Sequence, residues 1–197
     1  MRVGILGGTF DPIHLGHVAA ALAAVKCARL DQVLLVPTNQ PPHRTAAKAP
    51  AEYRLDMCRL AAAGDPRLDC SDVELTRPGP SFTLDTLKEL RERRPEDELF
   101  LILGWDAARL FRTWREPKQV CELASVVVVG RPGTGSPKDV DLQAAALGGP
   151  GVTLCLEHTP AISASEIRRD VAADRPIAGK VSPEVERYIR AHHLYAQ

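Results

Sequence analysis

The feature that most constrains this chain is the change from a short apolar run at residues 3–6 to a helical apolar pattern that starts near residue 15. The run is too short for a helix and is bounded by glycines, so it predicts a buried strand. The apolar residues that recur at helical spacing after it are Val18, Ala21, Leu22 and Val25. Residues 7–17, with the sequence GGTFDPIHLGH, therefore form a strand-to-helix turn.

Two features of this turn suggest a ligand site. Gly7 and Gly8 let the backbone approach a ligand closely, and a helix N-terminus offers free N–H groups and a positive dipole end. That combination is typical of a phosphate site, although a glycine turn before a helix can also be an ordinary connection. His14 and His17 lie three residues apart and share one face if the helix has begun. Zinc ligation is the weaker alternative, because the zinc helix motif needs a spacing of four and a glutamate.

The same eleven residues resemble the GGTFDPxHxGH signature of the bacterial nicotinate mononucleotide adenylyltransferases, which belong to the HxGH nucleotidyltransferases. The resemblance implies transfer of the adenylyl group of ATP to nicotinate mononucleotide, with release of pyrophosphate. It also implies that the family's phosphate-facing catalytic residues correspond to His14, His17 and Arg168. No protein nucleophile is expected, because positioning and charge stabilisation carry this type of reaction.

Residues 163–168, SASEIR, resemble the family's second signature, SxSxIR. From spacing alone, Ser163 and Glu166 predict a capping box at the start of a helix. The resemblance adds that the hydroxyls, the helix amides and Arg168 hold the polyphosphate of ATP. The ATP-binding residues that it implies are Gly7, Gly8, Thr9, Phe10, His14, His17, Gly104, Asp106, Ser163, Ser165, Ile167 and Arg168.

Three segments between the signatures extend the resemblance: PPHR at 41–44, PSFTLDTL at 80–87 and ILGWD at 102–106. The mononucleotide-binding residues that follow are Asn39, His43, Arg44, Thr83, Trp114, Arg115 and Arg131. Each has a simpler alternative, such as partial burial for Trp114 or helix capping for Asp106. Arg115 stands where the family usually has tyrosine, which raises the hypothesis that it strengthens selection for a carboxylate. Mg²⁺ is expected on the substrate phosphates, with few or no protein ligands.

Length and composition fit a small globular enzyme. The 197 residues suit a single nucleotidyltransferase domain, 1–197. Equal numbers of basic and acidic residues, 25 of each, argue against a nucleic-acid binder. We see neither a signal peptide nor an apolar stretch of about eighteen residues that could cross a membrane, so the chain is expected to be cytoplasmic. The five cysteines are odd in number and widely spaced, which favours buried thiols in a reducing compartment.

The order of elements predicts an α/β fold. Strands are expected at residues 3–6, 32–36, 99–103, 126–129 and 152–156, and residues 68–75 are expected to hold a short strand with an irregular end. Helices are expected at residues 15–29, 52–63, 81–93, 163–170 and 182–192, with a loop over 133–151. This alternation predicts a Rossmann-like, doubly wound, mainly parallel sheet with a small C-terminal helical extension. In such sheets ligands lie beyond the carboxyl ends of the strands, where the polar residues named above should converge.

Rival functions remain at this point. Phosphopantetheine adenylyltransferases and cytidylyltransferases share HxGH, and a nucleotide-sensing regulatory module is a rival from another class. The segments between the two signatures favour the nicotinate enzyme over the former, and the presence of both histidines and Arg168 disfavours the latter. The preference between nicotinate and nicotinamide mononucleotide stays open. So does the oligomeric state, a homo-oligomer included.

Overall fold

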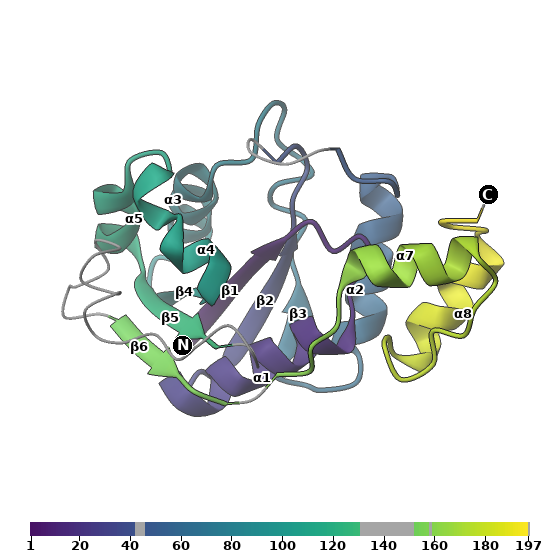
Figure 1. The fold of residues 1–197 in the computed structure, drawn as a ribbon. Helices are drawn as coiled ribbons and strands as arrows, with labels where there is room; N and C mark the ends of the chain where they lie inside the picture. Colours follow the sequence, from purple (N-terminus) through teal and green to yellow (C-terminus); the bar gives the residue numbers. More distant parts are fainter. Residues whose placement is uncertain (42–45, 131–151, 158, 197) are drawn as a thin grey trace.

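A computed structural model describes residues 1–41, 46–130, 152–157 and 159–196 (Figure 1). Its centre is a six-stranded, wholly parallel sheet in the order β3-β2-β1-β4-β5-β6. The strands are β1 Arg2–Gly8, β2 Gln32–Pro37, β3 Leu68–Cys70, β4 Glu98–Gly104, β5 Ser125–Val129 and β6 Val152–Cys155. The predicted doubly wound fold is confirmed, and the strand order reverses direction between β1 and β4.

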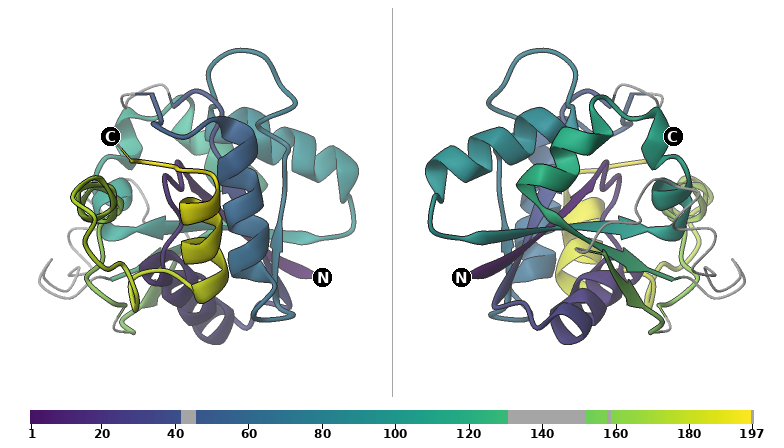
Figure 2. Two further views of the ribbon diagram at one scale, coloured as in Figure 1. Left: turned by 90° about the vertical axis from the view of Figure 1, so that its right-hand side faces the viewer. Right: turned by 90° about the vertical axis from the view of Figure 1, so that its left-hand side faces the viewer.

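Helices cover both faces of the sheet, as its apolar strands require. They are α1 Leu15–Ala28, α2 Ala51–Ala62, α3 Thr83–Arg93, α4 Trp105–Arg109, α5 Pro117–Leu123, α7 Ala164–Ala172 and α8 Pro183–Ala191, with a 3₁₀ turn η1 at Phe111–Thr113. Alternate residues of β1 point to opposite faces. Leu6 packs in the core under α1, α2, α7 and α8, whereas Val3 and Ile5 pack in the core under α3, α4 and α5. Figure 2 shows α8 alongside α2.

The C-terminal helices α7 and α8 form the predicted extension at one end of the molecule (Figure 1). The predicted capping box at Ser163 is wrong. Ser163 is the N-cap residue of α7, but its side chain makes no capping hydrogen bond. Glu166 instead accepts a 2.5 Å hydrogen bond from Lys180 Nζ, because a full charge attracts the carboxylate more strongly than a backbone N–H does. Ser182, in contrast, does cap α8, by accepting a hydrogen bond from the Val185 N–H.

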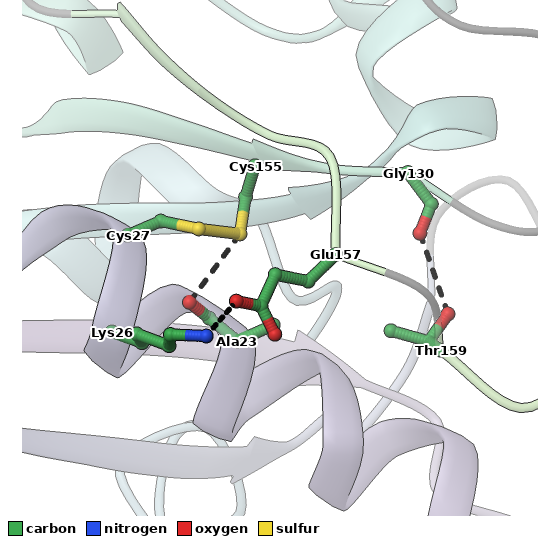
Figure 3. The surroundings of a disulfide bond; sticks show 7 residues. All are labelled: Ala23, Lys26, Cys27, Gly130, Cys155, Glu157 and Thr159. Atoms are coloured by element: carbon green, nitrogen blue, oxygen red, sulfur yellow. Dashed lines mark hydrogen bonds and ion pairs between the residues drawn. A yellow bond between two sulfur atoms is a disulfide. The ribbon is translucent and has the colours of Figure 1, made fainter.

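The cysteine prediction is also wrong. Cys27 near the end of α1 and Cys155 at the end of β6 form a disulfide, with their Cα atoms 5.7 Å apart (Figure 3). Of the free cysteines, Cys58 is buried, Cys70 is partly exposed and Cys121 is exposed. Sequence spacing could not reveal the pair, because 128 residues separate its members.

No bounds could be predicted for two short helices, α4 and α5, because neither is long enough to show a clear helical period, although the capping alternative for Asp106 assumed a helix after it. Asp106 lies in the first turn of α4, whose N-cap residue is Gly104, so Asp106 does not cap that helix. The loop expected over 133–151 lies outside the described residues. None of the helices in the described part of the chain is long and apolar enough to cross a membrane.

Candidate active site

The turn between β1 and α1 is held by close packing. Phe10 is only 2% exposed and adopts a positive φ of 48°. A Cβ atom on Gly8 would lie 2.8 Å from the Phe10 ring, so the second glycine is needed for this contact. A Cβ on Gly7 would meet nothing within 4 Å, which leaves open space beside the backbone there.

His14 and His17 lie together at the start of α1. Their rings stack with centroids 3.7 Å apart, and the edge of Phe10 meets the His17 ring at 5.0 Å. His14 is the N-cap residue, and its backbone N–H donates a 3.3 Å hydrogen bond to His17 Nδ1. An accepting Nδ1 carries no proton, so this hydrogen-bond pattern assigns the ring N–H of His17 to Nε2.

Gly16 explains why a glycine separates these histidines. Its Cβ would lie 3.0 Å from His14 Nδ1 and 3.1 Å from the carbonyl oxygen of Pro160. Both distances are tighter than ordinary van der Waals contact. Any side chain at residue 16 would therefore press the buried His14 ring out of place.

Asp11 connects the turn to the rest of the site. Its buried carboxylate accepts hydrogen bonds from the N–H of Lys48 at 2.8 Å and from the N–H of Ala49 at 3.0 Å. The Tyr195 hydroxyl donates a third, at 2.9 Å. Burial, with the nearby Asp11 charge, raises the pKa of Tyr195 far above its ordinary value, so this hydroxyl stays protonated and remains a donor.

Arg168 joins the two predicted phosphate-binding segments. Its Nη1 donates a 2.5 Å hydrogen bond to the main-chain oxygen of Asp11, and its Nη2 donates to Ser165 Oγ at 3.2 Å. Residues 157 positions apart in sequence are thus in direct contact. Ser163 and Ser165 are exposed at the N-terminal end of α7, beside the turn that carries the histidines.

Arg54 fixes the ends of the first two strands. This arginine is 2% exposed, and its Nη1 donates 2.8 Å hydrogen bonds to the carbonyl oxygens of both Thr9 and Thr38. Burial lowers the pKa of its guanidinium, with the Asp11 carboxylate opposing that effect. The signal for this role was present in the sequence: Arg54 stands four residues before Cys58, on the apolar face of α2.

A cavity of about 310 Å³ opens at the carboxyl ends of β1, β2 and β4, which is where the strand order predicts a ligand. The predicted site residues that line it are Gly7, Gly8, Thr9, Thr83, Gly104, Trp114 and Arg115. Trp114 packs against Phe111 with ring centroids 5.4 Å apart. The guanidinium of Arg115 lies 5.0 Å from the Phe82 ring centroid and 3.2 Å from Asp85.

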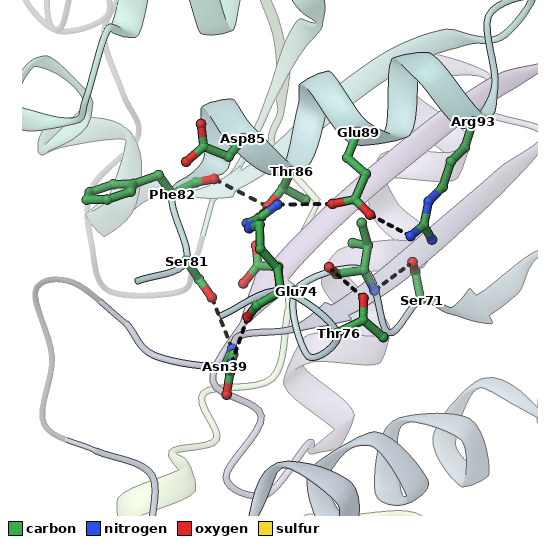
Figure 4. Close-up of polar contacts among 12 residues, drawn as sticks. Asn39, Ser71, Glu74, Thr76, Ser81, Phe82, Asp85, Thr86, Glu89 and Arg93 are labelled. Atoms are coloured by element: carbon green, nitrogen blue, oxygen red, sulfur yellow. Dashed lines mark hydrogen bonds and ion pairs between the residues drawn. The ribbon is translucent and has the colours of Figure 1, made fainter. Parts of the chain in front are cut away.

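Glu74 is an acidic residue in the cavity wall that the sequence did not single out. Its Oε1 accepts a 2.7 Å hydrogen bond from Thr86, and Arg77 donates to the same hydroxyl at 3.1 Å. Figure 4 shows Glu74 close to Ser81 and Asn39, where Ser81 Oγ accepts the Asn39 N–H. Burial raises the pKa of Glu74, and hydrogen bonds such as that from Thr86 oppose the rise only in part.

The remaining predicted residues fall into three groups. Asn39 does not line the cavity, and its side chain donates to the carbonyl oxygen of Arg77. Ile167 is fully buried in the core, so any contact with ATP would have to come from its backbone, and Asp106 is exposed. The predicted residues that lie outside the described part of the chain are His43, Arg44 and Arg131. Asp11 and Tyr195, which hold the turn, were not predicted as site residues.

Known proteins match this chain over nearly its whole length. The sequence profile of the cytidylyltransferase-like family matches residues 5–170. A probable nicotinate-nucleotide adenylyltransferase of Thermus thermophilus is 47% identical over 99% of this chain and 100% of its own length. A relative of the same name from Leifsonia xyli is 41% identical, over 98% of this chain and 94% of its own.

A solved structure shares the fold. Nicotinic acid mononucleotide adenylyltransferase of Plasmodium falciparum, complexed with NaAD, superposes with a TM-score of 0.79 over 98% of this chain and 97% of its own, at 19% identity. The sequence relatives are similar enough over their whole length to establish the family, and the structural match supports the same overall fold. This chain belongs to the cytidylyltransferase-like family and, within it, to the family of the nicotinate-nucleotide adenylyltransferases.

Proposed function

We propose that this chain transfers the adenylyl group of ATP to nicotinate mononucleotide, giving nicotinate adenine dinucleotide and pyrophosphate. The observation that carries the proposal is the contact between Arg168 and Asp11, which brings the two signature segments together. Gly7, Gly8 and Thr9 of the first segment also line a ligand-sized cavity. The 47% identical relative named for this activity supports the same conclusion.

In the proposed reaction the 5′-phosphate of the mononucleotide attacks the α-phosphorus of ATP, and pyrophosphate leaves. His17, with its ring N–H at Nε2, and His14 would donate hydrogen bonds to the α-phosphate as charge builds up there. Ser163, Ser165 and Arg168 would hold the leaving pyrophosphate, together with the N–H groups at the start of α7. Gly104 and Asp106 are assigned to the nucleotide at the end of β4.

The mononucleotide is assigned to the cavity beside these groups. The partly exposed ring of Trp114 is suited to stacking on a pyridine ring, and the backbone N–H of Thr83 lies in the first turn of α3, where a substrate carboxylate is favoured. Arg115 at the rim supplies a positive charge, although Asp85 partly neutralises it. The roles of Asn39, His43, Arg44 and Arg131 stay predictions from the resemblance.

Mg²⁺ fits this arrangement when its ligands come mainly from the substrates. The described residues contain no group of three or more His, Cys, Asp or Glu side chains that could hold a metal ion. Phosphate oxygens and water are ligands that Mg²⁺ accepts readily. The ion would neutralise charge on the triphosphate, while Arg168 and the α7 amides orient it.

The test is pyrophosphate release by the purified protein with magnesium, ATP and one acceptor at a time. We expect turnover with nicotinate mononucleotide, slower turnover with the nicotinamide form, and none with phosphopantetheine. The Arg168→Ala variant serves as the control for contaminating activity. Turnover with phosphopantetheine, or with CTP in place of ATP, would replace the proposal with one of the other HxGH activities.

A further inference from the structure

The chain after α8 returns to the turn that carries the histidines. Beyond Ala191 the backbone bends through positive φ values at His193 (50°) and Tyr195 (65°). Leu194 N–H still bonds to the carbonyl of Ile189 at 3.0 Å, so this segment is anchored to the end of the helix. The bend carries the Tyr195 hydroxyl to within 2.9 Å of Asp11 Oδ1, across 184 residues of sequence.

The two oxygens of the Asp11 carboxylate have different surroundings. Oδ1 accepts from the Ala49 N–H and from Tyr195, whereas Oδ2 accepts from the Lys48 N–H at 2.8 Å. Oδ2 also lies 3.7 Å from Arg168 Nη1, which is an ion pair but too far for a hydrogen bond. The carboxylate and Arg168 are thus close without being directly bonded.

This spacing affects how Arg168 can bind an anion. A guanidinium that is bonded directly to a carboxylate has fewer donors and less net charge to offer a phosphate. Here Nη1 donates to the neutral carbonyl of Asp11, and Nη2 extends to Ser165 at the start of α7. The hydroxyl of Tyr195 acts together with the N–H groups of Lys48 and Ala49, and these three donors hold the carboxylate in the rotation in which Oδ2 lies 3.7 Å from Nη1.

We propose that Tyr195 is a positioning residue, whose hydrogen bond to Asp11 keeps the guanidinium of Arg168 available for the phosphate chain of a nucleoside triphosphate. Without this bond, the carboxylate turns toward Arg168 and competes with the phosphate. The identity of the phosphate as the leaving group of ATP rests on the proposed function. The competition between the Asp11 carboxylate and an anion for Arg168 does not depend on the proposed function.

The experiment compares Tyr195→Phe with Tyr188→Phe. Tyr188 is a matched control, because its hydroxyl also donates a 2.9 Å hydrogen bond to an aspartate, Asp56 of α2, whose carboxylate pairs with Arg59 of the same helix. Calorimetry measures the affinity of each protein for ATP and for inorganic pyrophosphate, and kinetics give KM and kcat. We expect Tyr195→Phe to weaken both affinities and raise the KM for ATP by about three- to tenfold, since one hydrogen bond to a charged group is lost. Its kcat should stay within about twofold, because the acceptor and histidine contacts remain. Tyr188→Phe should bind as the unaltered protein does.

A double-mutant cycle with Arg168→Ala identifies the route of the effect. If Tyr195 acts through Arg168, adding Tyr195→Phe to Arg168→Ala should change pyrophosphate affinity no further. The inference would be overturned if Tyr195→Phe weakened pyrophosphate binding as much in Arg168→Ala as in the unaltered protein. It would also be overturned if Tyr195→Phe and Tyr188→Phe bound pyrophosphate with equal affinity. A change in melting temperature alone would overturn it as well. If the unaltered protein binds pyrophosphate but transfers no adenylyl group, the proposed function fails while the binding data still decide the role of Tyr195.

Discussion

The imidazole ring of His14 stacks on that of His17, with centroids 3.7 Å and planes 19° apart. The edge of the Phe10 ring meets the His17 ring at 5.0 Å and packs against the same stack. The stack also holds both rings at the start of α1, where the proposed reaction needs hydrogen-bond donors.

The first prediction concerns His17→Ala. A donor that acts on charge developing in the transition state contributes mainly to kcat, so we expect kcat to fall by about 10²–10³-fold, with the KM for ATP nearly unchanged. Steady-state kinetics measure both. His192→Ala is the control, because His192 also makes an aromatic contact, with Tyr188 at 4.2 Å, but is the C-cap residue of α8 and not part of the turn. A rise in KM with kcat unchanged would show that His17 only binds ATP.

The second prediction concerns Gly16→Ala. The added methyl would lie 3.0 Å from His14 Nδ1, so the ring has to move, and we expect kcat to fall by about tenfold or more. Alanine itself is favourable in the first turn of a helix, so any fall in the melting temperature reflects the close contacts with His14 and with the Pro160 carbonyl oxygen. Gly64→Ala is the matched control, since its Cβ would meet only the Ala61 carbonyl, at 3.7 Å. Full activity of Gly16→Ala would mean that the position of His14 is not critical.

The third prediction concerns Glu74 and pH. Burial raises the pKa of Glu74 in the folded state above its ordinary value of 4.5, so folding favours the protonated form. Below the pKa that Glu74 has in the unfolded chain, its burial does not lower the free energy of unfolding. As pH rises from that pKa toward the higher pKa of the folded state, the free energy of unfolding falls by up to about 1.4 kcal/mol per pH unit. Glu74→Gln keeps an oxygen for Thr86 and cannot ionise.

We expect the melting temperature of Glu74→Gln to exceed that of the unaltered protein by an amount that increases above pH 4.5 and then levels off. Calorimetric scans across this pH range measure the difference. Exposed Glu122→Gln is the control and should show no such trend. A difference that is constant with pH would contradict the assigned cause.

The fourth prediction concerns the disulfide. Cys27 and Cys155 lie 128 residues apart, so their disulfide closes a large loop in the unfolded chain and lowers its entropy. The loop-entropy relation gives a stabilisation of the folded state of about 4–5 kcal/mol. Reductant should lower the melting temperature of the unaltered protein and of Cys121→Ala, but not that of Cys27→Ala. Thiol counts in denaturant should rise from three to five on reduction. Five thiols before reduction would restore the expectation from sequence.

The fold was predictable because strands that are buried on both faces appear as unbroken apolar runs. The runs at Ile5 and Val127 are of this kind, and both lie in interior strands of the sheet. Short elements such as α4 carry too few turns for a period to emerge, and tertiary contacts define them instead. At the start of α7, the local pattern failed because Lys180, 14 residues further along the chain and beyond the end of α7, attracts Glu166 away from the cap.

The site was predictable only in part, because local sequence pattern does not show tertiary contacts. The residues that face substrates lie within short signature segments, so local sequence identifies them. The residues that hold those segments in place lie outside the signatures, so the signatures do not identify them. Glu74 and Tyr195 act through contacts with Thr86 and Asp11, and nothing next to them in the chain indicates those partners. The place of Arg54 on the apolar face of α2 indicates that its side chain is buried, but not that it binds the carbonyl of Thr9.

The contact between Asp11 and Arg168 has a consequence for the order in which function is acquired during synthesis. A nascent chain that has emerged as far as Cys155 contains every strand of the sheet and both histidines, yet neither α7 nor Tyr195 exists outside the ribosome. The sheet can therefore form before the part of the site that grips the phosphate chain does. Affinity for the nucleotide should rise when α7 is delivered and reach its full value only after the segment that carries Tyr195 has emerged.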